Sequence, residues 1–223
     1  ACLLGLTATP KNTIHQSTYE FFDMKNNMPT DVYEYNEAVY QDHVLVPYHL
    51  IETSTKITDD GLTYEKLDEE EREQYEDEFC EDDGLVDHIP PEKINTYIFN
   101  RDTVDIMISD LMNHGIKHKN GNHVGKTIIF AQNKRHAKYI IERFDVLYPQ
   151  YKGAFCKLVV CDEPYAEKNL EDFKKPDEYP FITVTVDMLE TGVDVPEITN
   201  LVFAKKVYSR IKFEQMIGRG TRL

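Results

Sequence analysis

The C-terminal half of the chain alternates helix-like and strand-like stretches, and this alternation limits the fold more than any other feature. Apolar residues recur at helical spacing in four segments, at 104–111, 137–147, 165–173 and 209–217. Short apolar runs typical of buried strands lie at 127–131, 155–160, 181–186 and 201–204. Strands joined through helices predict right-handed crossovers. We therefore expect an α/β fold with a mostly parallel sheet and helices on both faces.

The N-terminal half predicts less regular structure. A helix over 13–22, a short helix near 37–40 and a strand over 48–55 are expected there. The chain carries 40 acidic and 25 basic residues among 223, for a net charge of -15. Fifteen of the acidic residues fall between 59 and 87, where only two residues are basic. This predicts a flexible acidic insert over 53–90 between an N-terminal region, 1–52, and the α/β domain, 91–223.

The acidic insert accounts for nearly all of the negative charge, since the rest of the chain has 25 acidic and 23 basic residues. Two stretches are basic: 111–141 has six Lys and Arg and no acid, and 201–223 has six against one. The overall charge therefore does not exclude a nucleic-acid partner. The insert itself is interpreted as solvated chain, with a DNA-mimicking or partner-binding segment as the alternative.

Several classes of protein are disfavoured. No apolar run approaches the roughly 18 residues that cross a bilayer, so no membrane association is expected. The four cysteines and eight histidines lack metal-ligand spacing, which predicts no metal site and a reducing, cytoplasmic location. The segment 121–127 resembles a phosphate-binding loop, but it precedes a strand instead of following one. It is interpreted as a basic turn.

Three segments carry motifs, and each is expected at the carboxyl end of a strand. They read Leu-Thr-Ala-Thr-Pro at 6–10, Thr-Val-Asp-Met-Leu-Glu-Thr-Gly-Val-Asp-Val-Pro at 185–196 and Gln-Met-Ile-Gly-Arg-Gly-Thr-Arg at 215–222. Together they resemble motifs III, V and VI of superfamily 2 helicases and translocases, with 127–131 in the place of motif IV. The closing Gly-Arg-Gly-Thr-Arg and the segment 32–48 look most like the motor (R) subunit of type I restriction-modification enzymes.

The resemblance implies a RecA-like second motor domain, preceded by a remnant of the first. It assigns Arg222 as the arginine finger and Arg219 as its partner at the ATP phosphates, while Gln215 couples nucleotide state to the domain interface. A planar guanidinium suits the charge that develops in phosphoryl transfer. Because Arg219 and Arg222 are three residues apart, they can share a turn and point into one cleft. A surface helix end paired with acids is the alternative.

Further roles follow from the resemblance. Gly192 and Gly218 permit close backbone approach to ATP, and Asp194 accepts from ribose hydroxyls or anchors its loop. Thr7 and Thr9 link hydrolysis to the grip on DNA. A turn or helix cap is the alternative for Asp194, and an ordinary strand end for the two threonines.

A DNA-binding face is implied for four other residues. Thr185 and Thr191 offer hydroxyls to a DNA phosphate, and Lys134 and Arg135 lie just after the strand expected at 127–131. A solvated helix start is the alternative for the basic pair.

The resemblance further implies a parent enzyme that uses ATP and Mg²⁺ and acts on double-stranded DNA. Its partners would be the specificity and methyltransferase subunits of a restriction-modification complex. The phosphate loop, the Mg²⁺-binding acidic box and the nuclease are expected upstream, so the isolated fragment should have negligible ATPase activity. The alternatives are a superfamily 2 repair helicase, a type III restriction motor and a non-catalytic interaction module.

Overall fold

The computed structural model describes residues 31–52, 100–161, 163–186 and 195–222. Beyond these ranges it describes Arg72 and four two-residue strands. The strands form two antiparallel pairs, β1 (Asn12–Thr13) with β2 (Gln16–Ser17) and β3 (Leu62–Thr63) with β4 (His88–Ile89).

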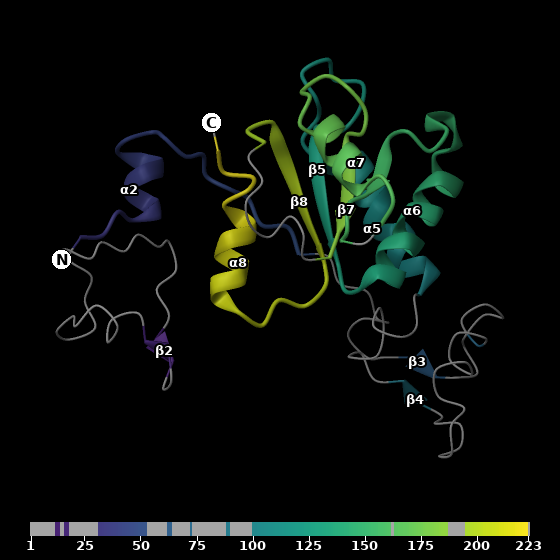
Figure 1. Cartoon of the computed structure of the whole chain (residues 1–223), viewed down its shortest axis with the longest axis horizontal. Coiled ribbons are helices and arrows are strands. Elements are labelled where there is room, and N and C mark those ends of the chain that lie inside the picture. The colour runs from purple at the N-terminus through teal and green to yellow at the C-terminus, as the bar shows by residue number, and fades with distance from the viewer. Residues whose placement is uncertain are drawn as a thin grey trace.

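A four-stranded parallel sheet forms the centre of the described structure (Figure 1). Its strands are β5 (Lys126–Ala131), β6 (Cys156–Leu158), β7 (Ile182–Thr185) and β8 (Ile198–Ala204). They lie in the order β6-β7-β5-β8, and every neighbouring pair is parallel. All four carboxyl ends therefore lie at one edge of the sheet, which we call the carboxyl end, and all four amino ends lie at the other.

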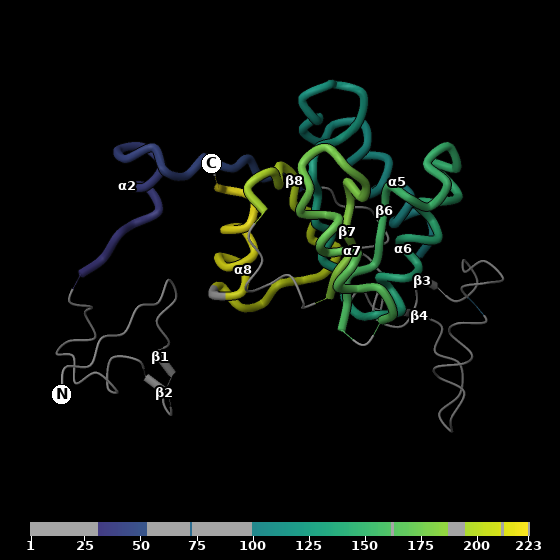
Figure 2. The backbone as a smooth tube through the Cα atoms, turned by 45° about the horizontal axis from the view of Figure 1, so that its top comes forward, coloured from purple at the N-terminus to yellow at the C-terminus, as the bar shows by residue number. Residues whose placement is uncertain are grey.

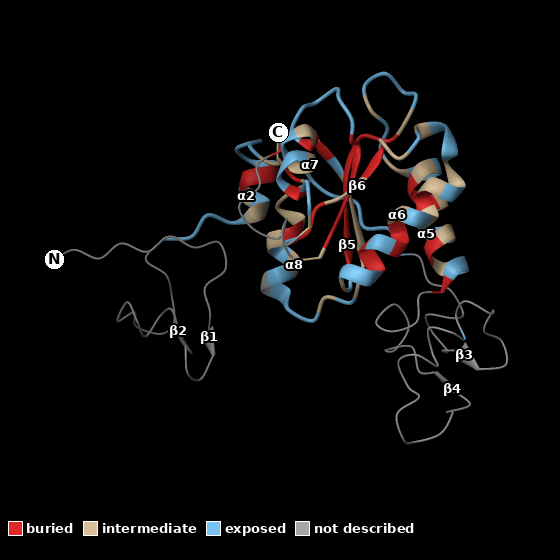
Figure 3. Ribbon diagram, turned by 45° about the vertical axis from the view of Figure 1, so that its right-hand side comes forward, coloured by how far each residue is buried: buried red, intermediate tan, exposed pale blue. Residues whose placement is uncertain are grey.

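Helices cover both faces of this sheet, as Figure 3 shows with the sheet seen nearly edge-on. One face packs against α5 (Arg101–His114) and α6 (Lys134–Leu147), and the other against α7 (Ala166–Phe173) and α8 (Arg210–Ile217). A short 3-10 helix, η3 (Pro149–Tyr151), follows α6. Side chains alternate along β5, so Ile129 joins the core under α6 while Ile128 and Phe130 join the core under α8.

Polar caps fix where three of these helices begin. The side chain of Asn100 accepts from the Thr103 amide before α5, and that of Asn133 accepts from the His136 amide before α6. Ser209 does the same before α8. Each cap satisfies an amide that has no partner inside the helix, a contribution of about 1 kcal/mol. The cap at Asn133 fixes the direction in which the chain leaves the carboxyl end of β5.

The segment 31–52 runs beside the C-terminus (Figure 2). It contains α2 (Tyr35–Tyr40), whose Ala38 and Val39 are buried. Leu45 forms an antiparallel bridge with Arg222, and the Val46 amide donates to the Thr221 carbonyl at 2.9 Å. Segments separated by more than 170 residues in the sequence are thus joined by backbone hydrogen bonds.

The α/β class, the parallel sheet and the covering of both faces are confirmed. Two local predictions are wrong: β2 lies within the helix expected over 13–22 and β1 ends at its first residue, and residues 48–52 form no strand. The rest of the 48–55 prediction lies outside the described residues. Where the structure is described, no helix is long and apolar enough to cross a membrane.

Candidate functional site

Basic side chains gather at the carboxyl end of the sheet, in the first turns of α6. Lys134, Arg135 and Lys138 are exposed there, directly after the turn that follows β5. Their positions follow from the cap at Asn133, which starts the helix at Lys134. The amides at a helix N-terminus also favour an anion. This part of the surface can therefore bind a negatively charged group.

A carboxylate already contacts two of these lysines. Glu163 lies in the connection between β6 and α7, and its Oε1 is 2.8 Å from Nζ of Lys134 and 2.8 Å from Nζ of Lys138. The Glu163 side chain is 18% exposed, against 44% for Lys134 and 49% for Lys138. The hydrogen bonds from Lys134 and then from Lys138 lower the pKa of Glu163 below its ordinary value. We call these three residues the Lys-Glu-Lys cluster.

The threonine predicted to meet DNA at this end is buried. Thr185 is the last residue of β7 and has no exposed surface in the described structure. Beyond it, the Lys205 ammonium donates to the Val186 carbonyl at 2.8 Å, joining the segments that leave β8 and β7. Thr191 lies outside the described residues, so the phosphate contacts of both threonines stay predictions.

The arginines lie in a loop that follows α8, over residues 218–222, which we call the arginine loop. The amide of Arg219 donates to the Met216 carbonyl at 3.0 Å, and that of Gly220 donates to the Ile217 carbonyl at 2.9 Å. Arg222 instead sits in the extended bridge with Leu45. The two arginines therefore do not share a helical turn, contrary to the expectation from their spacing.

The arginine loop lies away from the carboxyl end of the sheet. In α8, Phe213 packs on Phe203 near the end of β8, with ring centroids 5.4 Å apart. Further along, a Cβ placed on Gly220 would lie 3.1 Å from the side chain of Leu201, which precedes Phe203 in β8. Since α8 runs back along β8, the prediction that all three motifs stand at strand carboxyl ends is wrong for this one.

Gln215 and Gly218 accompany the arginines at this end of α8. Both are partly buried, and Gly218 caps the helix with its amide donating to the Glu214 carbonyl. The other residues predicted to contact ATP or to couple its hydrolysis, Gly192, Asp194, Thr7 and Thr9, lie outside the described residues. The structure thus separates Gln215, Gly218 and the arginines from the basic start of α6.

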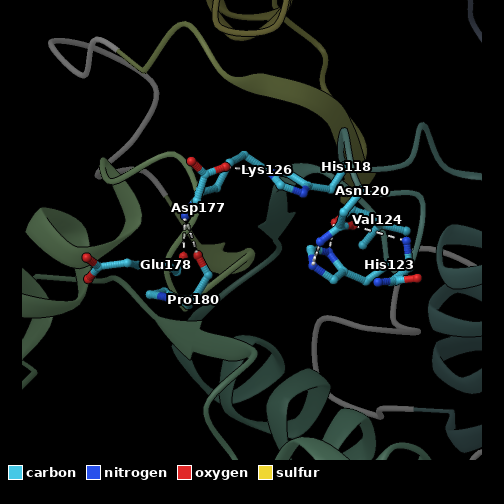
Figure 4. A network of polar contacts seen from close by, with 9 residues as sticks. His118, Asn120, His123, Val124, Lys126, Asp177, Glu178 and Pro180 are labelled. Carbon is cyan, nitrogen blue, oxygen red and sulfur yellow. Dashed lines mark hydrogen bonds and ion pairs between the residues drawn. The ribbon is translucent and has the colours of Figure 1, made fainter.

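The amino end of β5 holds a lysine of a different kind, drawn in Figure 4. Lys126 is 1% exposed, and its ammonium donates at 2.8 Å to the carbonyls of Glu178 and Pro180. It also lies over the rings of Phe173 and Phe181, at 5.1 and 4.7 Å from their centroids. Burial lowers its pKa to about 8, against the opposing effect of nearby carboxylates.

The loop before Lys126 folds into a hairpin. Lys117 bridges Val124, and His118 ties the hairpin to the neighbouring loop through Asp177, with Nε2 and Oδ1 3.0 Å apart. A shallow hollow of about 740 Å³ opens beside His118 and Asp177. Because Lys126 enters a strand and not a helix, the interpretation of 121–127 as a turn and not a phosphate loop is confirmed.

Two residues of interest do not stand out in the sequence. Glu163 follows the strand predicted at 155–160, and the rule that strand carboxyl ends meet at one edge is the signal that points to it. Lys126 belongs to the predicted basic turn, although its place at the start of an apolar run is a signal for burial. Within the described ranges, no group of three His, Cys, Asp or Glu could hold a metal ion.

The chain is similar to a helicase domain family and to two curated proteins of one kind. Residues 103–223 match the family model described as the helicase conserved C-terminal domain. Over its whole length the chain is 31% identical to the type I restriction enzyme EcoKI endonuclease subunit of Escherichia coli K12 and 27% identical to the EcoAI endonuclease subunit of E. coli. It spans only 19% and 26% of these two proteins.

A solved fragment assigned to an HsdR subunit of a type I restriction enzyme from Vibrio vulnificus YJ016 is also similar. It has a TM-score of 0.46 and 26% identity over 55% of this chain and 25% of that one. By sequence the chain is similar to endonuclease subunits of type I restriction enzymes, and its parallel sheet between two helical layers is of the α/β class. The family match covers more than half of the residues, so the chain belongs to the helicase conserved C-terminal domain family.

Proposed function

We propose that this chain is part of the motor of a type I restriction endonuclease R subunit, an ATP-dependent translocase on double-stranded DNA. The observation that carries the proposal is the cluster of exposed basic side chains at the carboxyl end of the sheet, on Lys134, Arg135 and Lys138. Similarity to two type I endonuclease subunits along the whole chain supports it.

The basic side chains at the start of α6 serve to hold the DNA backbone. Lysine and arginine contacts to phosphate carry no sequence information, which suits a motor that must move along any sequence. Thr185, at the end of β7, and Thr191, further along the chain, are proposed to add hydroxyl contacts. Their role requires the buried Thr185 hydroxyl to become accessible when DNA is bound.

The arginine loop serves the nucleotide. Two guanidinium groups in partly buried positions, Arg219 and Arg222, are suited in chemistry to a polyphosphate. When bound with Mg²⁺, ATP supplies the γ-phosphoryl group whose transfer to water releases the energy for movement. Arg222 is proposed to neutralise charge on that group, Arg219 to hold the phosphates, and Gln215 to connect this end of α8 with the domain interface.

The remaining assignments extend this proposal. Gly192, Asp194 and Gly218 are proposed to line the nucleotide site, and Thr7 and Thr9 to couple it to DNA. The division into 1–52, 53–90 and 91–223 fits a first-domain remnant, an acidic insert and a second motor domain. The assembled enzyme would include specificity and methyltransferase subunits, and the isolated chain would hydrolyse ATP negligibly because one motor domain supplies half of the site.

An Arg222→Ala change in the full R subunit tests the proposal. We expect DNA-stimulated ATP turnover to fall about 1,000-fold, because a missing arginine finger typically costs that much, while DNA affinity changes less than about twofold. Arg210→Ala is the matched control: Arg210 opens α8, is 91% exposed and pairs only with Glu214 among the contacts described for its side chain. Retained turnover in Arg222→Ala, or equal loss in Arg210→Ala, would contradict the proposed role.

A further inference from the structure

The Lys-Glu-Lys cluster places an acid at the point where the basic surface would meet a phosphate. One oxygen, Oε1 of Glu163, lies 2.8 Å from both lysine ammonium groups. A phosphate oxygen bound by two lysines would make the same two charge-assisted contacts. The carboxylate therefore occupies the position that an anionic ligand would take.

The backbone around the cluster positions the Glu163 carboxylate, while the three side chains of the cluster stay partly exposed. Glu163 lies in the short connection that leaves the carboxyl end of β6, and its backbone carbonyl accepts from the Ala166 amide at 3.3 Å as α7 begins. The lysines come from α6, whose start is fixed by the Asn133 cap. The three side chains remain 18% to 49% exposed, so water and ions reach the cluster.

The exposure of the cluster decides how strong the contact is. Ion pairs between exposed groups contribute little, typically up to about fivefold in an equilibrium constant for one pair. A DNA phosphate also gains from the release of counterions, which a single carboxylate on the same chain does not offer. A phosphate can therefore displace the carboxylate, but only at a cost in affinity.

We propose that Glu163 is a built-in competitor for DNA phosphate, which holds Lys134 and Lys138 in the unbound state and is displaced when DNA binds. The inference rests on the proposed DNA-binding function of the start of α6. It adds a residue that limits the affinity of the motor for DNA. A moving motor must release each phosphate in turn, and a carboxylate within reach of both lysines supplies a replacement partner at each release.

The test is the affinity of the full chain for a fluorescent DNA duplex of arbitrary sequence, measured without nucleotide at low salt. Glu163→Gln keeps the size of the side chain and removes its charge, so we expect it to tighten binding about three- to tenfold. Glu171→Gln is the control, since Glu171 has the same charge and pairs with Lys174 at 2.7 Å, at the C-terminal end of α7. It should change affinity less than about twofold.

Two further variants separate the inference from the proposed function. In a Lys134→Gln, Lys138→Gln background, adding Glu163→Gln should have no effect, because the groups it competes for are gone. Equal changes in Glu163→Gln and Glu171→Gln, or weaker binding in Glu163→Gln, would overturn the role of Glu163. Unchanged binding in the double lysine variant would instead overturn the DNA-binding role of α6, and with it the inference.

Discussion

Lysines lie at both ends of β5, buried at the amino end and exposed at the carboxyl end. At the amino end, Lys126 is 1% exposed and its ammonium donates hydrogen bonds to two backbone carbonyls. At the carboxyl end, Lys134 and Lys138 are about half exposed and share one carboxylate. Only Lys134 and Lys138 can exchange their partner for a ligand. If the buried ammonium of Lys126 moved away, its two carbonyl acceptors would lose their hydrogen bonds without gaining water. The burial of the side chain therefore distinguishes a lysine that stabilises the fold from a lysine that can bind a ligand.

The largest expected difference between the two ends is in stability. Lys126→Met should lower the free energy of unfolding by about 2–4 kcal/mol, since the carbonyls of Glu178 and Pro180 lose their donor. Lys134→Met, which removes an exposed ion pair, should cost less than about 0.5 kcal/mol. Urea unfolding of the two variants measures both. Similar costs for the two substitutions would remove the distinction between the two ends.

A second prediction concerns the one buried titratable group in the basic start of α6. His136 is 1% exposed, and burial lowers its pKa to about 4. Between pH 6.5 and 4 the unfolded chain binds this proton and the folded chain does not, so stability is lost as the pH falls through that range. The loss should reach about 2–3 kcal/mol.

The measurement is urea unfolding at several pH values between 7 and 4.5, for the natural chain and for His136→Asn. Asparagine retains an acceptor for the Gln132 amide, which lies 3.3 Å from Nδ1 of His136. The natural chain should lose more stability on acidification than the variant does. Parallel curves would contradict a lowered pKa for His136 in the folded chain.

The sequence predicts the elements of the sheet domain because their hydrophobic periods are clear. The helix boundaries at Asn133 and Ser209 are readable from capping chemistry. The start of β8 escapes prediction because Thr199 and Asn200 interrupt its apolar pattern. Asn200 nevertheless belongs there, since its side chain bonds both the amide and the carbonyl of Ile116 at 2.7 and 3.0 Å.

The candidate site is predictable only in part. The rule that strand carboxyl ends meet at one edge places Lys134 and Arg135, but the pairing with Glu163 depends on how α6 packs beside β6, which no local pattern encodes. The predicted place of the arginine loop is wrong for a related reason. The second half of the strand before it, 201–204, is predicted correctly, but α8 carries the chain back along β8 before the arginines are reached.

The most direct test of the binding role of the carboxyl end is the salt dependence of DNA affinity in the full chain. For Lys134→Gln combined with Lys138→Gln, the slope of log K against log salt should become less steep by about 2, because each phosphate that is no longer neutralised reduces it by about 0.9. Lys174→Gln combined with Lys175→Gln makes the same change in charge at the end of α7 and should leave the slope unchanged. An unchanged slope in the first variant, or an equal change in both, would contradict a DNA-binding role for the start of α6.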